Sequence, residues 1–169
     1  ILMKNLKEII KQLELKPHPE GGFYKETYRS TGELSENNLD SNYQGSRNYS
    51  TCIYFLLTSN DFSAFHRIQQ DEIWHFYMGS PILLHTISED GTHSNFTIGK
   101  DLLKGEVPQL IVPGGHWFGA EVIEPDTYSL VGCTVAPGFD FKDFELPSRQ
   151  YLVNLFPKHQ QIITRLTHN

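Results

Sequence analysis

The chain has 169 residues, of which 38% are hydrophobic and 20% charged, as expected of one globular domain. Its net charge of -6 and the lack of a dense basic run argue against a nucleic-acid partner, because backbone phosphates are bound by clustered cations. No stretch reaches the roughly 18 to 20 apolar residues of a membrane helix, and the N-terminus lacks a secretory apolar region. Cys52 and Cys133 lie in apolar runs without CxxC spacing. We therefore expect two buried, reduced thiols in a cytoplasmic protein with no membrane partner.

The first third of the chain predicts a helix, a strand and a long loop. Apolar residues recur at three- and four-residue spacing within residues 1–15, which indicates a short amphipathic helix: Leu2, Leu6, Ile9, Ile10 and Leu13. Pro17 and Pro19 end it. Residues 23–29 are typical of an extended segment. Residues 30–48 are polar and predict a mobile loop, and loops of this length are usually functional or disordered.

The remainder predicts an all-β domain. Strand-like runs punctuated by Gly, Pro, Asp and Asn occupy residues 51–58, 64–68, 73–78, 82–88, 93–98, 110–112, 117–123 and 129–136. Many short strands at such intervals favour a sandwich or barrel, and the absence of repeated βα units argues against a Rossmann or TIM plan. We assign residues 50–137 to a core barrel. Residues 138–169 form a C-terminal extension, with a helix starting at Pro147-Ser148 and stopped by Pro157. No second domain is predicted.

The segment from Phe65 to Gly79 carries the most specific pattern. It resembles the first motif of the cupin superfamily, HxHxxxExxxxxxG, with His66, Glu72 and Gly79 in register and Ile68 at the second histidine. The second cupin motif, PxGxxHxxxN, begins correctly at Pro113. It has Phe118 at the histidine position, with His116 two residues earlier.

Strand alternation predicts which of these side chains share a face. If Glu72 faces the interior, Trp74 and Phe76 line the cavity while His75 and Tyr77 face away. A polar His-Arg pair within an apolar strand destabilises the fold unless it is hydrogen-bonded or used, so we expect a site role for His66 and its neighbour. The candidate catalytic residues are His66 and Glu72; the candidate ligand-binding residues are Arg67, Trp74, Phe76, His116, Phe118 and Glu20.

A divalent metal is an open alternative. His66, Glu72 and His116 would make a two-His-one-carboxylate set of the kind used by non-haem iron. Against it, Ile68 and Phe118 replace two of the four usual cupin ligands.

Over nearly its full length the chain resembles the fifth family of the cupin superfamily, a domain of unknown function. The resemblance is carried by five stretches in order: residues 17–28, 50–57, 65–75, 112–118 and 130–139. It implies a cupin jelly-roll β-barrel, with the short N-terminal and C-terminal helices predicted above, similar to the deoxysugar epimerases and seed-storage cupins. It also implies a homodimer. It implies no established reaction.

The segment from Glu20 to Tyr28 looks like the early strand of the deoxysugar-nucleotide epimerases. There it frames a substrate pocket, and a histidine base acts beside a tyrosine acid without metal. The likeness implies His66 as the base, because imidazole titrates near working pH, with Tyr128 and Tyr77 as candidates for the acid. Alternatively, Glu20-Gly21-Gly22 is only a turn whose glycines allow positive φ.

Two classes of function follow. The first is an isomerase or epimerase acting on a small polar or sugar-like molecule, or a metal-dependent variant of it that uses His116. The second is a non-catalytic cupin that holds such a molecule in an aromatic cavity.

Overall fold

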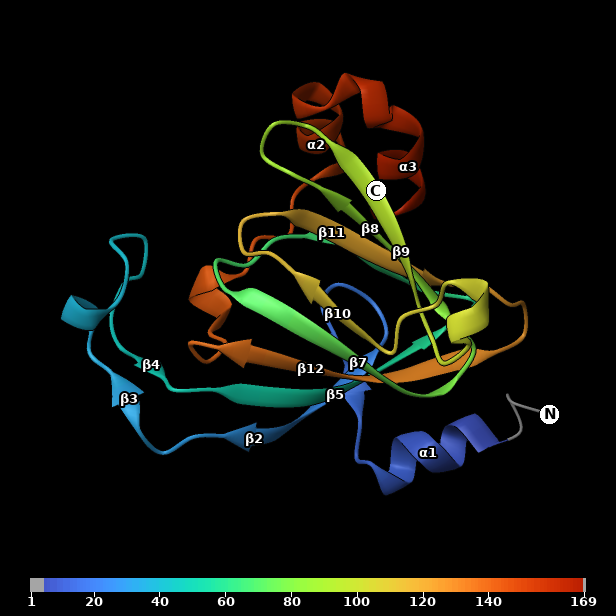
Figure 1. Cartoon of the computed structure of the whole chain (residues 1–169), viewed down its shortest axis with the longest axis horizontal. Helices are drawn as coiled ribbons and strands as arrows, with labels where there is room; N and C mark the ends of the chain where they lie inside the picture. Colours follow the sequence, from blue (N-terminus) through green and yellow to red (C-terminus); the bar gives the residue numbers. More distant parts are fainter. Residues whose placement is uncertain (1–4, 169) are drawn as a thin grey trace.

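The computed structural model describes residues 5–168, and its body is formed by two large antiparallel sheets packed face to face (Figure 1). One sheet has the order β1 (Lys16–Pro17), β2 (Phe23–Arg29), β5 (Thr51–Thr58), β12 (Tyr128–Ala136), β7 (Asp71–Gly79) and β10 (Gln109–Val112). The other has the order β6 (Phe62–His66), β11 (Trp117–Val122), β8 (Ile82–Ile87) and β9 (His93–Ile98). The predicted jelly roll is confirmed, although over the described residues the two sheets remain separate and do not close into one continuous barrel.

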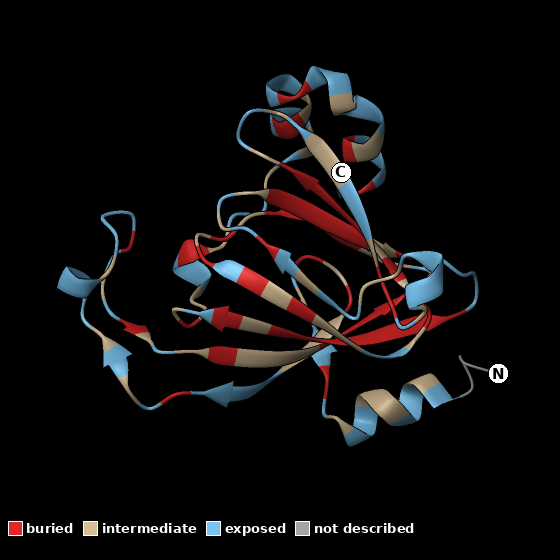
Figure 2. Ribbon diagram, in the orientation of Figure 1, coloured by how far each residue is buried: buried red, intermediate tan, exposed pale blue. Residues whose placement is uncertain are grey.

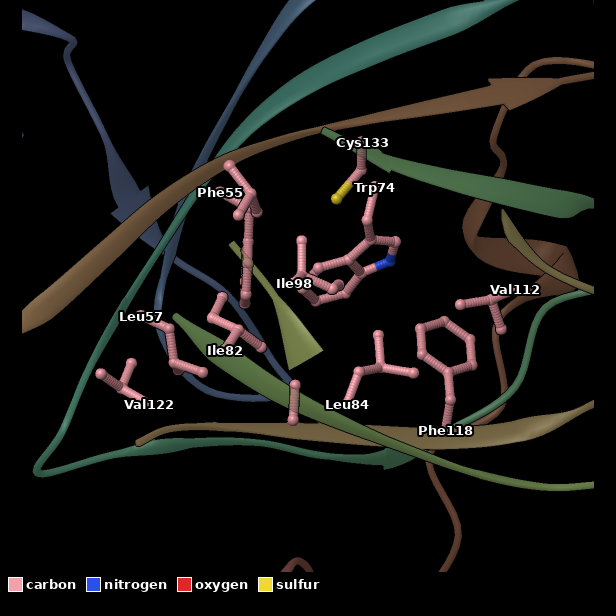
Figure 3. Packing of buried hydrophobic residues seen from close by; sticks show 12 residues of the cluster. Phe55, Leu57, Trp74, Ile82, Leu84, Ile98, Val112, Phe118, Val122 and Cys133 are labelled. Atoms are coloured by element: carbon pink, nitrogen blue, oxygen red, sulfur yellow. The ribbon is translucent and has the colours of Figure 1, made fainter. Parts of the chain in front are cut away.

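The main core lies between the sheets (Figure 2). The predicted alternation holds on β7, where Trp74 is buried and Tyr77 is exposed. This core contains Trp74 and Cys133 from the six-stranded sheet and Phe118 and Leu84 from the four-stranded sheet (Figure 3). Fully burying a side chain of this kind stabilises the fold by about 1.5–3 kcal/mol, so this layer fixes the strands that carry the site.

Short helices cover parts of the outer faces. α1 (Leu6–Gln12) packs Leu6, Ile9, Ile10 and Leu13 against the six-stranded sheet, as its spacing predicts; Leu2 lies outside the described residues. The helix ends earlier than predicted, at Gln12, because Glu14, just beyond it, has a positive φ of 53°. α2 (Arg149–Leu155) and α3 (Gln160–Arg165) cover the four-stranded sheet. Ser148 caps α2, and the helix ends before Pro157, as predicted.

The polar segment 30–48 contains regular structure that its composition does not predict. β3 (Glu33–Leu34) pairs with β4 (Arg47–Asn48), and the 3₁₀ turn η2 (Glu36–Asn38) lies between them. Arg47 is buried and forms a two-bond ion pair with Asp143, at 2.8 and 2.7 Å. Asp143 belongs to η4 (Phe141–Asp143), and the other 3₁₀ turns are η3 (Leu102–Lys104) and η5 (Pro157–His159). The mobility of the segment stays a prediction.

Neither thiol is in a disulfide, as predicted. Cys133 is buried, but Cys52 is only half-buried, because it lies on the outer side of β5, opposite Tyr28 of β2. None of the described helices has the length and apolar character needed to span a bilayer.

Candidate functional site

A cavity of about 890 Å³ opens at one end of the sandwich, lined by β2, β5, β7, β12 and the segment after β12. His66, Glu72 and Glu20, three of the residues singled out from the sequence, line it together. Their side chains come from β6, β7 and the turn before β2, so residues as distant in the chain as Glu20 and Glu72 meet here.

The turn from His18 to Gly22 delivers Glu20 to the cavity. The Gly21 N–H donates to the His18 carbonyl, and the Ala64 N–H donates to the Glu20 carbonyl at 2.7 Å, which fixes the turn against β6. Gly21 has φ of 111°, and a Cβ there would lie 2.0 Å from the Phe62 carbonyl oxygen, so only glycine fits. The two interpretations of Glu20-Gly21-Gly22 are thus compatible: the glycines form a tight turn, and the turn places a carboxylate in the cavity.

Glu20 and His66 form a buried ion pair. Nε2–H of His66 donates to Glu20 Oε2 at 2.9 Å, and Nδ1–H donates to the Ala64 carbonyl at 2.7 Å. Ser63 Oγ donates to the other carboxylate oxygen at 2.9 Å. Since a carbonyl and a carboxylate only accept, both ring nitrogens carry protons and the ring is an imidazolium. Burial alone lowers the pKa of His66, but the charge and hydrogen bond of Glu20 outweigh it, so the pKa is raised.

Glu72 is a second buried carboxyl group in the same cavity. Burial raises its pKa to about 7, against the opposing charge of His66 and with the help of the negative charge of Glu20. The thiol of Cys133 lies beside it, and burial raises the pKa of that thiol well above its usual range. The indole nitrogen of Trp74 has no partner at hydrogen-bond distance among the described residues. It is nevertheless close enough to stabilise the ionised form of Glu72 and so to oppose the rise of its pKa. Glu72 therefore exchanges its proton near neutral pH.

His18 adds a neutral imidazole to the wall. Its Nδ1 accepts the Glu20 backbone N–H at 3.2 Å and therefore carries a lone pair. Nδ1 also lies 3.7 Å from Glu20 Oε2, but this is an ion pair only if His18 is protonated. Burial lowers the pKa of His18, which agrees with the neutral form. Its ring packs edge-on against Tyr24 at 4.6 Å.

An aromatic group closes part of the cavity. Phe139, Phe141 and Phe144, which follow β12, are called the cap; their ring centroids lie 4.9 to 6.3 Å apart. Phe144 also contacts His66, at 5.5 Å. The Arg47–Asp143 ion pair holds the base of the cap. Nothing in the sequence spacing of these phenylalanines assigns them to a cavity.

The remaining predicted site residues lie elsewhere. Trp74 and Phe76 belong to the core, and Phe118 packs on His66 with centroids 4.1 Å apart, without lining the cavity. Arg67 pairs with Glu145 at 2.8 Å and lies over Trp117 on the outer side. His116 lines a separate shallow depression beside Thr86 and Asp90.

The two candidate tyrosine acids also lie away from the cavity. Tyr128 is buried beneath α1, and Tyr77 is exposed on the outer face of the six-stranded sheet. Tyr24, which the sequence does not single out, is the tyrosine that lines the cavity. Tyr24 lies in the segment that resembles the epimerase strand, and this resemblance could have identified it from the sequence.

The residues present do not fit the metal site of the cupin fold. A metal needs the lone pair of a neutral imidazole, but both nitrogens of His66 already donate hydrogen bonds. Ile68 and Phe118 supply no donor atoms, and His116 is in the other depression. Among residues 5–168 no three His, Cys, Asp or Glu side chains gather in a way that could hold an ion. No chemical step is therefore assigned to a metal.

Comparison with known proteins places the chain in a family. Residues 7–147 match the family model described as "Cupin superfamily (DUF985)". The uncharacterized protein YML079W of Saccharomyces cerevisiae is 34% identical over 149 residues, covering 82% of this chain and 73% of that protein.

Solved structures agree with this. Protein SO0799 of Shewanella oneidensis is 40% identical with a TM-score of 0.87, covering 96% of each chain. A hypothetical protein from Leishmania major is 35% identical with the same TM-score, covering 96% of this chain and 98% of that one. Oxalate decarboxylase from Bacillus subtilis shares the fold alone: its identity is 13%, its TM-score 0.53, and the match covers 89% of this chain and 36% of the decarboxylase. The chain thus belongs to the DUF985 family of the cupin superfamily.

Proposed function

We propose that this protein binds a small sugar-like molecule in the cavity and moves a proton on it, as a sugar isomerase does. One observation carries the proposal: a buried carboxyl group, Glu72, lines the same cavity as a buried imidazolium–carboxylate pair. Isolated acids are rarely buried without such a use, because an unpaired buried charge destabilises the fold. The second candidate, a non-catalytic binding protein, needs only the aromatic walls and leaves Glu72 without a role.

The proposed step uses Glu72 as the base. Its carboxylate takes the proton of a C–H group next to a ligand carbonyl, and the C–H electron pair forms a carbon–carbon double bond while the carbonyl oxygen becomes an enolate. Glu72 then delivers the proton to the former carbonyl carbon. The hydroxyl group on the carbon that lost its proton gives its own proton to the enolate oxygen, and that carbon becomes the new carbonyl. Nothing is oxidised or reduced overall.

The base is assigned to Glu72 instead of His66 because of the hydrogen bonds. An imidazolium with both N–H groups donating has no lone pair to accept a proton. A carboxyl group with a pKa of about 7 is present in both protonation states at neutral pH, as a general base and acid requires. An epimerase would need a further acid on the opposite face of the ligand, for which Tyr24 is the cavity-lining candidate.

Solvent exchange tests this function without a known substrate. A panel of free pentoses and hexoses is incubated with the protein in D₂O, and deuterium at carbon is followed by NMR. We expect one or more members to exchange with the wild type and none with Glu72→Gln. Glu145→Gln, in an exposed ion pair outside the cavity, serves as the matched control and keeps the exchange. Binding without exchange by the wild type would favour the non-catalytic role.

We also propose that the protein forms a homodimer. The outer face of the six-stranded sheet exposes apolar side chains beyond the area that α1 covers, among them Tyr77 and Ile111, which are 49% and 58% exposed. Ile111 pairs with Ile73 on the neighbouring strand, so these side chains form one surface. Light scattering should give twice the monomer mass for the wild type and a smaller value for Ile111→Glu. The two free thiols favour a reducing compartment, and the cytoplasm is the proposed location.

A further inference from the structure

The rim of the cavity carries equal numbers of opposite charges. The charged lining residues outside the buried interior are called the rim. The rim cations are Lys16, Lys25 and Arg29, and the rim acids are Glu14, Glu26 and Asp140. Lys25 forms an ion pair with Glu14, and Arg29 forms one with Glu26 at 2.8 Å. Lys16 also lies close enough to Glu14, and Asp140 close enough to Arg29, for their opposite charges to attract. Within the described residues, each rim cation therefore has an acid close to it.

Arg29 is the rim residue best suited to bind a phosphate, but four of its five N–H donors are already used. Nε and Nη2 donate to the Glu26 carboxylate at 2.9 and 2.8 Å. Nη1 donates to Asn48 Oδ1 at 2.7 Å, and Nη2 donates also to the Phe139 carbonyl at 2.9 Å. Phosphate recognition by arginine relies on two parallel free donors. A phosphate at the rim would have to break the Arg29–Glu26 pair.

The interior offers aromatic faces and little fixed charge. Phe141 of the cap is 50% exposed, although its ring packs at nearly right angles to the rings of Phe139 and Phe144. A half-exposed phenylalanine on a cavity wall gives a ligand an apolar face to cover. Deeper inside, the charges of Glu20 and His66 cancel, which leaves Glu72 as the acidic group not committed to an ion pair.

From this charge balance we infer that the ligand is an uncharged sugar, neither phosphorylated nor linked to a nucleotide. Its C–H face lies on the cap, and its carbonyl or hydroxyl edge points to Glu72. This assignment rests on the proposed function and restricts it: the same cavity excludes sugar phosphates and nucleoside diphosphate sugars, because the rim has no spare cation pair for them.

Binding and exchange are measured separately to test it. Saturation-transfer NMR at pH 7 compares free pentoses and hexoses with their phosphate esters and with UDP-glucose. We expect a free sugar to bind at least about tenfold more tightly than its ester, a difference of about 1.4 kcal/mol. Tighter binding of an ester, or no binding by any free sugar, overturns the ligand class. Deuterium exchange on an ester alone would overturn the class and leave the proposed function standing. Binding of free sugars without exchange would overturn the proposed function and leave the ligand class standing.

A rim variant tests the cause of the selectivity. In Glu14→Gln/Glu26→Gln the cations lose their partners, and the affinity of an ester relative to its free sugar should rise about tenfold and fall again with added salt. Glu36→Gln/Glu89→Gln makes the same change of net charge at two exposed acids and should leave the ratio as in the wild type. A thermal unfolding curve confirms that both variants fold. An unchanged ratio in the rim variant overturns the assignment of selectivity to the rim.

Discussion

Two buried ion pairs within residues 5–168 have different surroundings. Arg47 and Asp143 join the segment 30–48 to the base of the cap, whereas His66 and Glu20 lie in the cavity wall. In the first pair the acceptors and donors are complete: Asp143 also accepts from Gln70 at 2.8 Å, and Arg47 also donates to the Ser46 carbonyl at 2.8 Å. It does not line the cavity.

The hydrogen bonds of the His66–Glu20 pair are complete as well, but a third ionisable group, Glu72, lies beside this pair. Glu72 faces the same cavity, and its ionised form lacks a cation of its own, because His66 is already paired with Glu20. The comparison teaches that a buried ion pair does not by itself mark a functional site. What distinguishes the His66 pair is access to a cavity and a neighbouring acid that the fold does not neutralise.

The largest effect is expected from the Arg47 pair. Asp143→Asn keeps the volume but leaves a buried guanidinium that cannot lose its proton, so the free energy of unfolding should fall by about 3–5 kcal/mol. Urea unfolding at pH 7 measures this. Glu145→Gln, which breaks the exposed pair with Arg67, should cost under about 1 kcal/mol. Equal losses in the two variants would contradict the structural role of the buried pair.

Glu72→Gln should stabilise the protein at high pH. The pKa of Glu72 is raised from 4.5 to about 7 by folding, so its contribution to stability is present below pH 4.5 and is lost as the pH rises through about 7. Glutamine has no such loss. Unfolding at a series of pH values should show the variant gaining on the wild type by about 3 kcal/mol between pH 4.5 and 8. A pH-independent difference would refute the raised pKa.

Glu20→Gln should destabilise the protein less than Asp143→Asn, by about 2 kcal/mol, because His66 can release its proton when the acid is removed. The Glu20 contribution is present above pH 4.5 and is lost as the pH falls through its lowered folded pKa. The His66 contribution is present below pH 6.5 and is lost as the pH rises through its raised folded pKa.

The cost of Glu20→Gln should therefore be greatest between pH 4.5 and 6.5, which urea unfolding across pH 3–9 resolves. Ser63→Ala, which removes one hydrogen bond to Glu20 and keeps the ion pair, is the matched control. A cost as large as that of Asp143→Asn at every pH would mean that the two pairs are equivalent.

The smallest effect on stability is expected at the cap. Phe141→Ala removes a half-exposed ring and should change the free energy of unfolding by about 0.5 kcal/mol. The same change should weaken the binding of a free sugar by up to about tenfold, since an aromatic contact contributes about 0.5–1.5 kcal/mol. Calorimetric titration with a sugar that binds the wild type measures the loss. An unchanged affinity would remove the cap from the ligand site.

The local pattern of this sequence was enough to predict the strands and part of the site. β5 and β9 begin and end at the predicted residues, because alternating apolar side chains and turn residues act over a few positions. His66 and Glu72 were predicted to share the interior from motif spacing and parity, and both line the cavity. The N-terminal helix followed equally well from its apolar face, since that face packs on the sheet as predicted.

Only the tertiary structure decided which residues from distant segments of the chain contact one another. No spacing relates Glu20 to His66, Glu72 to Cys133, or Arg47 to Asp143, because these contacts join segments 46 to 96 positions apart. Those contacts set the protonation states: His66 became a paired cation, and Glu72 became the acid that titrates near pH 7. The sequence alone determines which side chains face inward; the fold decides their charge, since a pKa depends on burial and on neighbours that only folding brings together.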